Sequence, residues 1–309
     1  MRFAKGHGTG NDFVIVPDLD NELDLTPELA AALCDRHFGI GGDGVLRVVR
    51  TSALDLPALA DGAPAPAASN GAQSPLSAGG AGSSLPPPEW FMDYRNADGS
   101  VAEMCGNGVR VFVRYLLEEG LAQGPEVAVL TRAGTRTVRV ARDGQFTVDM
   151  GAAAVLGEGS ADAGGRRLSG LAISVGNPHL ACMIDQPVGA VDLSGPWMLG
   201  PAELADGANI EIVRLLGEHE IEMRVHERGS GLTLSCGTGA VAAAVAAAAT
   251  VGEWPAAPAE WTVHVPGGTL AVTPSVTASL LTGPAEIVAR GVLAAGWAGR
   301  QSPVRLGAI

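Results

Sequence analysis

Lysine is almost absent from this chain of 309 residues, because Lys5 is the only one. Enzymes that use pyridoxal phosphate bind it as a Schiff base on a lysine, so the chain offers very little for that chemistry. Basic residues are scarce altogether, since 20 lysines and arginines face 33 aspartates and glutamates and give a formal net charge of −13. This balance disfavours attraction to nucleic acid or to an anionic membrane, and we expect neither as a partner.

Cysteine is also rare, and its pattern argues against disulfides and metals. Four cysteines are too few for a disulfide scaffold in a chain of this length, so we expect reduced thiols. The cysteines and the six histidines lack the short paired spacings of zinc sites, so no metal is expected. The start of the sequence lacks the apolar core of a signal peptide, and no stretch is typical of a spanning helix. Together these absences predict a cytoplasmic protein whose chemistry needs no cofactor.

Two of the cysteines open near-identical turns, and this repetition is the most informative feature present. The turns are Cys105-Gly106-Asn107-Gly108 and Cys236-Gly237-Thr238-Gly239, and each leads into an apolar segment typical of a helix. The first turn of a helix presents free N–H groups and the positive end of its dipole, which lower a thiol pKa and attract a carboxylate. We therefore expect both thiol pKa values to lie nearer neutrality than the usual value of about 8.5.

Paired thiols suit one kind of reaction. Inverting a carbon that carries an acidic proton requires a base on one face and an acid on the other, and two facing cysteines supply both. A single buried cysteine is more often only a small apolar side chain. We assign that structural role to Cys34 and Cys182, which lack a comparable context.

Strand patterns outnumber helix patterns along the chain. Three segments predict helices, at Pro27–Cys34, Val109–Glu119 and Ala240–Val251. Alternating apolar segments predict strands, among them Phe13–Val16, Val127–Thr131, Val138–Val140, Phe146–Val148, Leu171–Val175 and Ile221–His226. Because two of the three helices follow a Cys-Gly turn, the pattern indicates a duplicated α+β unit.

Three further segments bear on organisation and binding. Residues 51–88 are rich in Ala, Gly, Pro and Ser, and we interpret them as a largely disordered surface insertion that is dispensable for chemistry. The polar groups of Gly176-Asn177-Pro178-His179 and of Glu227-Arg228 follow predicted strands, where binding groups are common. We place His179 in a turn; a hydrogen-bonded loop histidine and a surface ion pair are the simpler alternatives for these two segments.

Two glycine-rich segments invite a nucleotide-binding interpretation that their context does not support. They are Gly39-Ile40-Gly41-Gly42-Asp43-Gly44 and Gly6-His7-Gly8-Thr9-Gly10-Asn11. A dinucleotide fingerprint requires a preceding strand, a long following helix and an acidic residue about 20 positions later. Neither segment meets all three conditions.

Motifs spread over nearly the whole sequence resemble diaminopimelate epimerase. They are Gly8-Thr9-Gly10-Asn11-Asp12-Phe13, Asn96-Ala97-Asp98-Gly99-Ser100, Met104-Cys105-Gly106-Asn107-Gly108, Gly176-Asn177-Pro178-His179 and Glu227-Arg228-Gly229 through Ser235-Cys236-Gly237-Thr238-Gly239. Only the insertion and residues 162–169 lie outside this resemblance.

The resemblance implies an α+β fold of two pseudo-symmetric lobes, each a β-barrel-like sheet around a central helix, with the active site in the cleft between them. We expect residues 1–149 to form the N-terminal lobe, with 286–309 returning to it, and residues 150–285 to form the C-terminal lobe. It also implies a homodimer and a cofactor-independent isomerase that interconverts LL- and meso-2,6-diaminopimelate in lysine and peptidoglycan precursor biosynthesis.

The same resemblance assigns roles to individual residues. It implies that Cys105 and Cys236 are the two acid–base groups, and that His179 and Glu227 tune their protonation and orient groups around them. The implied substrate-binding residues are Asn11, Asn96, Gly106, Asn107, Asn177, Asn209, Glu227, Arg228, Gly237 and Thr238. The backbone N–H groups of Gly106-Asn107 and Gly237-Thr238 would hold the carboxylate at the reacting carbon.

The sequence departs from the family pattern at two positions and leaves alternatives open. Gly44 stands where many members carry glutamine, and Leu232 stands where a glutamate is usual. A two-thiol racemase of the proline or hydroxyproline type is one alternative function. A redox protein with a reversible Cys105–Cys236 disulfide is another, although a Cys-x-x-Cys motif is missing. A noncatalytic amino-acid-binding protein is the third.

Overall fold

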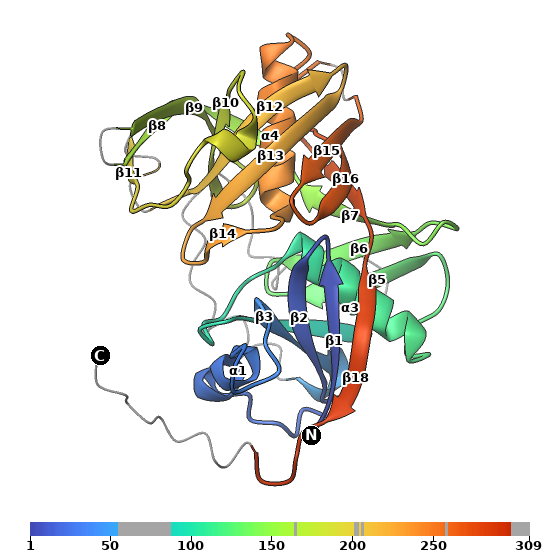
Figure 1. The fold of residues 1–309 in the computed structure, drawn as a ribbon. Coiled ribbons are helices and arrows are strands. Elements are labelled where there is room, and N and C mark those ends of the chain that lie inside the picture. Colours follow the sequence, from blue (N-terminus) through green and yellow to red (C-terminus); the bar gives the residue numbers. More distant parts are fainter. Residues whose placement is uncertain (55–87, 164–165, 201–203, 205–206, 257–258, 298–309) are drawn as a thin grey trace, which may run out of the picture.

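The computed structural model describes residues 1–54, 88–163, 166–200, 204, 207–256 and 259–297, in which strands predominate (Figure 1). The helices are α1 (Pro27–Cys34), α3 (Gly106–Glu118) and α4 (Gly237–Thr250), with short 3-10 turns η1 (Thr51–Ala53) and η2 (Val188–Ala190). The strands of the first part are β1 (Arg2–Gly8), β2 (Asn11–Pro17), β3 (Gly44–Arg50), β4 (Trp90–Asn96), β5 (Glu126–Thr131), β6 (Gly134–Val140) and β7 (Phe146–Gly151). The later strands are β8 (Ala154–Ala163), β9 (Arg166–Ser174), β10 (Pro178–Met183), β11 (Met198–Gly200), β12 (Asn209–Gly217), β13 (Glu220–Glu227), β14 (Gly231–Thr233), β15 (Trp261–Val265), β16 (Gly268–Thr273), β17 (Ser279–Gly283) and β18 (Glu286–Val292).

Strand pairing repeats between the two parts of the chain. In the first, β1–β2 is antiparallel, β2–β3 parallel, β3–β4 antiparallel, β4–β5 parallel, and β5–β6–β7 antiparallel. In the second, β9–β10, β10–β12, β12–β13, β13–β15 and β15–β16–β17 follow the same order of antiparallel and parallel pairs. Helix α3 lies between β4 and β5 in the chain, and α4 lies between β13 and β15. The duplicated α+β unit predicted from the two Cys-Gly turns is therefore confirmed.

Each of these helices lies at the centre of its own lobe. The first lobe comprises β1–β7, β18, α1 and α3, and the second comprises β8–β17 and α4 (Figure 1). Helix α3 contacts β1–β7 and β18, and α4 contacts β9, β10, β12, β13 and β15–β17. Because α4 is enclosed by strands, its residues are apolar on all sides, and Ala240–Ala248 is buried throughout. The short alanine side chains let the strands come close to the helix.

The lobes are joined through strands from distant parts of the sequence. Strand β7 pairs with β17 across the two lobes, and β18 returns to pair antiparallel with β1 (Figure 1). Strand β18 flanks β1 as β8 flanks β9, so the final strand completes the first lobe. Our proposed boundary at residues 149 and 150 falls within β7, and it stays a prediction.

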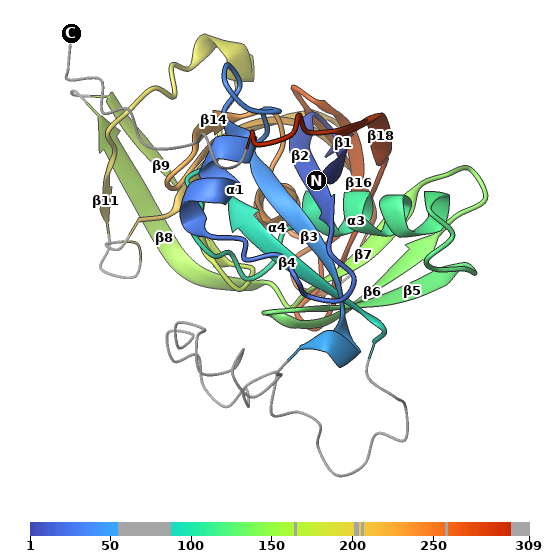
Figure 2. The same cartoon turned by 90° about the horizontal axis from the view of Figure 1, so that it is seen from below.

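Other sequence-based expectations can be compared with these elements. The predicted helix Pro27–Cys34 matches α1, which packs Leu33 and Cys34 against the outer side of β2 and β3 (Figure 2). Helices α3 and α4 begin three residues earlier than expected. The placement of His179 in a turn is wrong, because it is the second residue of β10. Most of the 51–88 insertion lies outside the described residues, so its disorder and dispensability stay predictions.

No helix in the described part of the chain is both long and apolar enough to cross a membrane.

Candidate active site

One cavity of about 1200 Å³ collects nearly all of the residues singled out in the sequence. Both lobes contribute to its lining, which includes Asn11, Asn96, Cys105, Gly106, Asn107, Asn177, Asn209, Glu227, Arg228, Cys236, Gly237 and Thr238. His179 does not line it. The structure therefore brings together both cysteines, five asparagines and an adjacent Glu-Arg pair.

The two helices meet head to head at this cavity. Cys105 is the N-cap of α3 and Cys236 is the N-cap of α4. A Cβ atom on Gly237 would lie only 3.4 Å from the Cα of Gly106, so the two helix starts are in close contact. The absence of side chains at these glycines allows that approach. Two sets of helix N–H groups consequently converge on one place, as an anionic group requires.

A buried amide ties the two cysteine turns together. The side chain of Asn107, in the first turn of α3, is fully buried. Its Nδ2 donates to the carbonyl oxygen of Ser235, next to Cys236, at 3.2 Å, and to Oδ1 of Asn11 at 3.2 Å. The relative position of the thiols thus depends on a hydrogen-bond network as well as on packing.

Cys105 is half-buried and faces an amide oxygen. Its Sγ accepts from the N–H of Gly108 at 3.4 Å and lies 3.7 Å from Oδ1 of Asn11, to which the thiol donates. The Nδ2 of Asn11 donates to Oδ2 of Asp43 at 2.7 Å. Because a carboxylate only accepts, Asp43 fixes the amide of Asn11 with its oxygen toward Cys105.

Cys236 is more deeply buried and has different neighbours. Its Sγ lies 3.5 Å from Oγ1 of Thr238, and Nδ2 of Asn209 donates to it at 3.9 Å. The backbone N–H of Arg228 donates to Oδ1 of Asn209 at 2.9 Å and so sets which end of that amide faces the sulfur. The negative charge of the Glu227 carboxylate also acts on this thiol and raises its pKa.

The pKa values of both thiols contradict the expectation drawn from helix starts. Burial raises the pKa of Cys105 to about 11, and the carboxylate of Glu227 adds to the rise. Burial also raises the pKa of Cys236 well above its usual value, with Glu227 and Glu211 contributing. Backbone N–H groups do lower both pKa values, as the sequence suggests, but desolvation outweighs them. In the free protein, the thiol form is therefore favoured at both positions by burial.

Glu227 is the acidic residue whose charge acts most strongly on the thiol of Cys236. It ends β13, and its carboxylate accepts a hydrogen bond from the hydroxyl of Thr233. Burial raises the pKa of Glu227, while the hydrogen bonds from Thr233 and Cys236 lower it. Next to it, the guanidinium of Arg228 donates to the carbonyl of Gly207 at 3.3 Å and lines the cavity.

His179 lies behind the cavity wall rather than in it. The side chain is completely buried, with Nδ1 2.7 Å from Oε1 of Glu211 and Nε2 3.0 Å from Oδ1 of Asn177. The Nδ2 of Asn177 donates to Oγ1 of Thr238 at 3.4 Å. A chain of contacts thus runs from Glu211 through His179, Asn177 and Thr238 and ends at the sulfur of Cys236.

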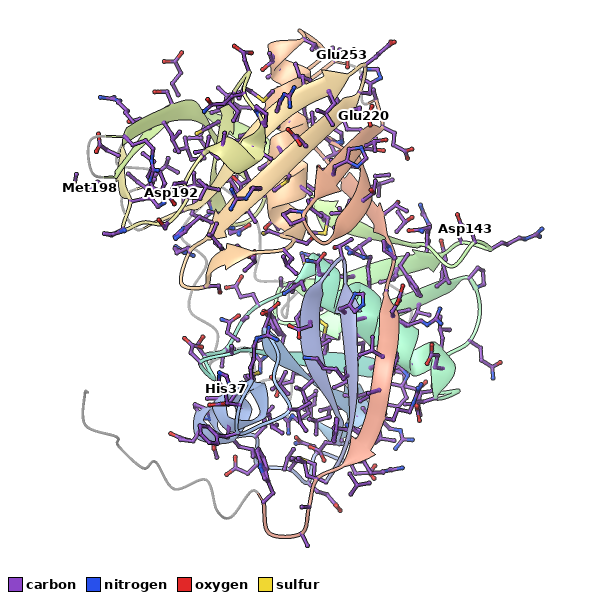
Figure 3. All side chains as sticks on the ribbon, in the orientation of Figure 1. His37, Asp143, Asp192, Met198, Glu220 and Glu253 are labelled. Carbon is purple, nitrogen blue, oxygen red and sulfur yellow. The ribbon has the colours of Figure 1, made fainter. Side chains whose placement is uncertain are left out.

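Full burial distinguishes this pair from two other His–Glu pairs of the second lobe. In the pairs His264–Glu220 and His219–Glu253 all four side chains are partly exposed, and Glu220 and Glu253 lie at the outer surface (Figure 3). Burial raises the pKa of Glu211, although its contact with His179 acts in the opposite direction.

The two departures from the family pattern have different surroundings. A Cβ on Gly44 would lie 2.6 Å from both the carbonyl oxygen of Arg95 and the ring of Tyr94. Tyr94 lines the cavity, so its ring occupies the space next to this glycine. Leu232 lies on β14, lines the cavity mouth and is half exposed.

Sequence reasoning missed three residues that support the site. Asp43 lies in a glycine-rich segment that we had considered only for nucleotides, while Glu211 and Arg110 are charged residues inside apolar runs. Asp43 and Arg110 contact Asn11 and Asn107 of the cavity lining, and Glu211 contacts His179 behind it. A charge within an otherwise buried stripe was the signal that could have identified the last two.

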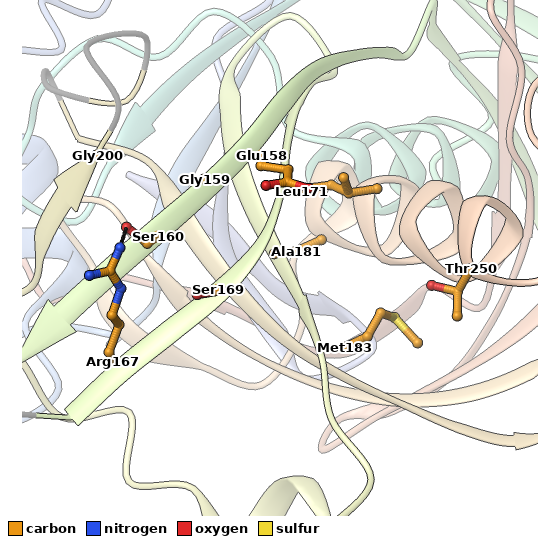
Figure 4. Close-up of a pocket in the computed structure, with 11 residues that line it drawn as sticks. Glu158, Gly159, Ser160, Arg167, Ser169, Leu171, Ala181, Met183, Gly200 and Thr250 are labelled. Carbon is orange, nitrogen blue, oxygen red and sulfur yellow. Dashed lines mark hydrogen bonds between the residues drawn. The ribbon is translucent and has the colours of Figure 1, made fainter.

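A second cavity of about 530 Å³ lies in the second lobe, between β8, β9, β10, β11 and the end of α4 (Figure 4). Its polar lining includes Ser160 and the exposed Arg167, whose Nη2 donates to the serine hydroxyl at 3.3 Å. Neither cysteine turn contributes to it. The cavity between the lobes is therefore the candidate site.

Comparisons with known proteins agree with this geometry. The family model "Diaminopimelate epimerase" matches residues 3–72, 77–156 and 171–288. The diaminopimelate epimerase of Thermobifida fusca (strain YX) is 54% identical over 291 residues, covering 94% of this chain and 97% of the relative. That of Mycobacterium sp. (strain KMS) is 48% identical over 308 residues, covering 96% and 98%.

Solved structures of lower identity share the fold. A hydroxyproline epimerase from Agrobacterium vitis with bound trans-4-hydroxy-L-proline has a TM-score of 0.62 at 14% identity, covering 94% of this chain and 91% of that one. A PhzF-family phenazine biosynthesis protein from Bacillus anthracis has a TM-score of 0.61 at 16% identity, covering 95% and 99%.

The extent of the family match corrects one expectation and supports another. We had placed all of residues 51–88 outside the family, yet the matched ranges include 51–72 and 77–88. Residues 162–169 do fall in the unmatched range 157–170. Since the model match and both relatives span nearly the whole sequence, the chain belongs to the diaminopimelate epimerase family.

Proposed function

We propose that this protein interconverts LL- and meso-2,6-diaminopimelate by passing protons between the substrate and two cysteines. The single observation that carries this proposal is the meeting of two helix starts in one cavity, each with a cysteine as its N-cap. The family's epimerase activity supplies the substrate, and the geometry supplies a base for one face of its α-carbon and an acid for the other.

The proton steps balance without any further reactant. One cysteine, as thiolate, takes the α-proton through its sulfur, and the C–H electron pair remains on the substrate and spreads into its carboxylate. The other cysteine, as thiol, delivers a proton to the opposite face and becomes the thiolate. The next turnover can run in the opposite direction with the roles exchanged.

The negative charge of the intermediate needs donors that are already in place. The backbone N–H groups of Gly106-Asn107 and Gly237-Thr238 lie at the two helix starts and would bind the reacting carboxylate. Because the donors are held by the helices, they need no reorganisation when charge develops. The high thiol pKa values caused by burial also make each thiolate a strong base once it forms.

The remaining polar residues would bind the distal part of the substrate. Glu227 and Arg228 offer opposite charges that suit the ammonium and carboxylate of a zwitterion, and asparagine side chains both donate and accept. We assign this role to Asn11, Asn96, Asn177, Asn209, Glu227 and Arg228, all of which line the cavity. His179 and Glu227 would control protonation of the cysteines, His179 by holding Asn177 from behind.

Three further expectations belong to the proposal. We propose that the enzyme works as a homodimer, as the family resemblance implies, and that it acts in the cytoplasm. We also propose that it needs no metal or organic cofactor.

Conversion of LL- to meso-diaminopimelate by the reduced protein tests the proposal. Activity should persist with a metal chelator present and without pyridoxal phosphate, and L-proline should not be racemised. Cys105→Ala and Cys236→Ala should each lower kcat by about a thousandfold or more, in keeping with loss of an acid or base. Cys34→Ala and Cys182→Ala are matched controls, because both thiols are buried in the core away from the cavity. Retained activity in either cavity variant would contradict the two-thiol mechanism.

A further inference from the structure

Arg110 is a completely buried cation in the middle of the first lobe. It lies in the second turn of α3 with no exposed surface, between apolar neighbours. Burial lowers the pKa of Arg110 to about 10, so the side chain still carries its charge at neutral pH. Burying an ion is costly unless an opposite charge accompanies it. An arginine in this position therefore requires a physical explanation.

The guanidinium is hydrogen-bonded but has no carboxylate partner within the described part of the chain. Nη2 donates to Oδ1 of Asn107 at 2.9 Å and to Oγ1 of Thr9 at 3.4 Å. Nη1 donates to the carbonyl of Gly106 at 3.3 Å, and Nε to that of Pro284 at 3.4 Å. These partners are neutral dipoles, which satisfy its N–H groups but leave its positive charge uncompensated.

Two glycines make room for the guanidinium. A Cβ on Gly8 would lie 3.1 Å from Nη2, and a Cβ on Gly283 would lie 3.3 Å from the same atom. Strands β1 and β17 therefore approach the guanidinium closely. Two of its hydrogen-bond partners, Gly106 and Asn107, lie in the first turn of α3, so we expect the compensating charge at the catalytic end of that helix.

Cys105 is the group that can supply that charge. The sulfur caps the same helix, and within the described ranges Cys105 is the one ionisable group whose charge acts appreciably on Arg110. The second turn has no such cation, because Val241 stands five residues after Cys236, as Arg110 stands five residues after Cys105. Cys236 instead faces the carboxylates of Glu227 and Glu211. The repeated turns thus carry electrostatic environments of opposite sign.

We propose that Arg110 is the buried counter-charge of the Cys105 thiolate when that thiolate forms, so that Cys105 loses its proton more readily than Cys236 and acts as the base while Cys236 acts as the acid. This inference rests on the proposed two-thiol function and deepens it. When Cys105 takes the α-proton, the negative charge moves to the substrate carboxylate at the start of the same helix, where Arg110 continues to stabilise it. Cys236, which faces the carboxylates of Glu227 and Glu211, holds the proton that is delivered to the other face.

The other ionisable groups around Cys105 do not provide a competing cation. Glu227, from β13, acts on it with a negative charge, and Tyr94, from β4, stays neutral because burial raises its pKa well above the usual value. Among the described residues, Arg110 is the only positive group that acts appreciably on this thiol. Its removal should therefore have an effect confined to one of the two cysteines.

The test measures alkylation of each cysteine by iodoacetamide as a function of pH, with the two peptides quantified separately by mass spectrometry. In the wild type, the pH midpoint for Cys105 should lie below that for Cys236. In Arg110→Met the midpoint of Cys105 should rise by about one pH unit or more, and that of Cys236 should stay unchanged. Arg110→Lys, which keeps the charge, should preserve most of the wild-type behaviour.

Arg114→Met is the matched control, because Arg114 lies one turn later on α3, is partly exposed and pairs with Glu118. A Cys105 midpoint that equals or exceeds that of Cys236 in the wild type would overturn the proposal, and this result does not depend on any variant folding. An unchanged midpoint in folded Arg110→Met, or equal shifts in both cysteines, would overturn it as well.

Turnover separates this proposal from the proposed function. Arg110→Met should lower kcat/KM for diaminopimelate at neutral pH by about tenfold or more and move the alkaline-rising limb of its pH profile upward, with Arg110→Lys restoring it. If the wild type converts no diaminopimelate while the midpoints differ as expected, the assigned substrate is wrong and the role of Arg110 stands. If the wild type is active and the midpoints do not differ, the epimerase function stands and the role proposed for Arg110 is wrong.

Discussion

The two cysteine turns have nearly the same sequence and the same place in their lobes, yet they are surrounded by different charges. Cys105 is half-buried, faces the amide oxygen of Asn11 and shares its helix with Arg110. Cys236 is more deeply buried and faces Glu227 and Glu211. The duplicated fold places both thiols at helix starts in one cavity, and the divergence around them gives each a different set of charged neighbours. The position of each thiol comes from the repeat, whereas its charged surroundings come from residues that the two halves do not share.

Of the substitutions considered below, replacing Glu227 should have the largest effect, because it changes the charge around Cys236. Burial raises the pKa of this carboxyl above its usual value, so below that raised pKa it is protonated and loses the negative charge that acts on Cys236 and suits a substrate ammonium. Activity of the wild type should therefore fall on the acidic side of neutrality, above the pH at which an ordinary glutamate titrates. Glu227→Gln should lower kcat/KM by about a hundredfold and remove this acidic limb.

A pH–rate profile of Glu227→Gln beside Glu222→Gln checks this expectation. Glu222 lies on the same strand but pairs with Arg214 at the partly exposed side of β13, so its variant should behave as the wild type. An acidic limb that persists unchanged in Glu227→Gln would assign it to another group.

Asn107 connects the two cysteine turns, so its replacement should lower both the stability of the fold and the activity. Asn107→Ala removes one buried hydrogen bond from each of Arg110, Asn11 and Ser235. We expect the free energy of unfolding to fall by about 2 kcal/mol. A displaced thiol pair should also lower kcat/KM by about tenfold.

Chemical denaturation and steady-state kinetics measure both effects for Asn107→Ala. Wild-type kinetics in this variant would show that packing of the glycines alone holds the two helix starts together.

Leu232 should have the smallest effect, although it departs from the family pattern. Its side chain lines the cavity mouth, is half exposed and lies outside the contacts made by either sulfur. Leu232→Glu should leave kcat/KM within about twofold of the wild type, as is usual for exposed positions. A rise of tenfold or more in the same assay would give the missing carboxylate a role in the reaction.

Local structure was well predicted from the sequence, because its signals are local. Thr26 and Pro27 mark the start of α1, and the Cys-Gly turns mark the starts of α3 and α4. The repeat of these turns also predicted the duplicated fold. His179 was misplaced because Gly176-Asn177-Pro178 has the composition of a turn, although the chain enters β10 at Pro178 itself.

The electrostatics of the site could not be predicted in the same way. A helix start lowers a thiol pKa, but burial, which depends on the whole fold, reverses the sign at both Cys105 and Cys236. Arg110 reaches Thr9 and Pro284 only when α3 is enclosed by strands, and Glu211 reaches His179 only when β12 pairs with β10. Which charge neighbours which thiol is therefore a property of tertiary structure.

The most direct test of the two-base account is the early course of the reaction in deuterated water. LL-diaminopimelate is incubated with the reduced protein, and deuterium at the α-carbon is followed by NMR in the product and in the remaining substrate. The account predicts that deuterium appears in meso product from the start while the remaining LL substrate keeps its proton, because separate thiols remove and deliver it. Equal early labelling of substrate and product, or product that retains the original proton, would contradict it.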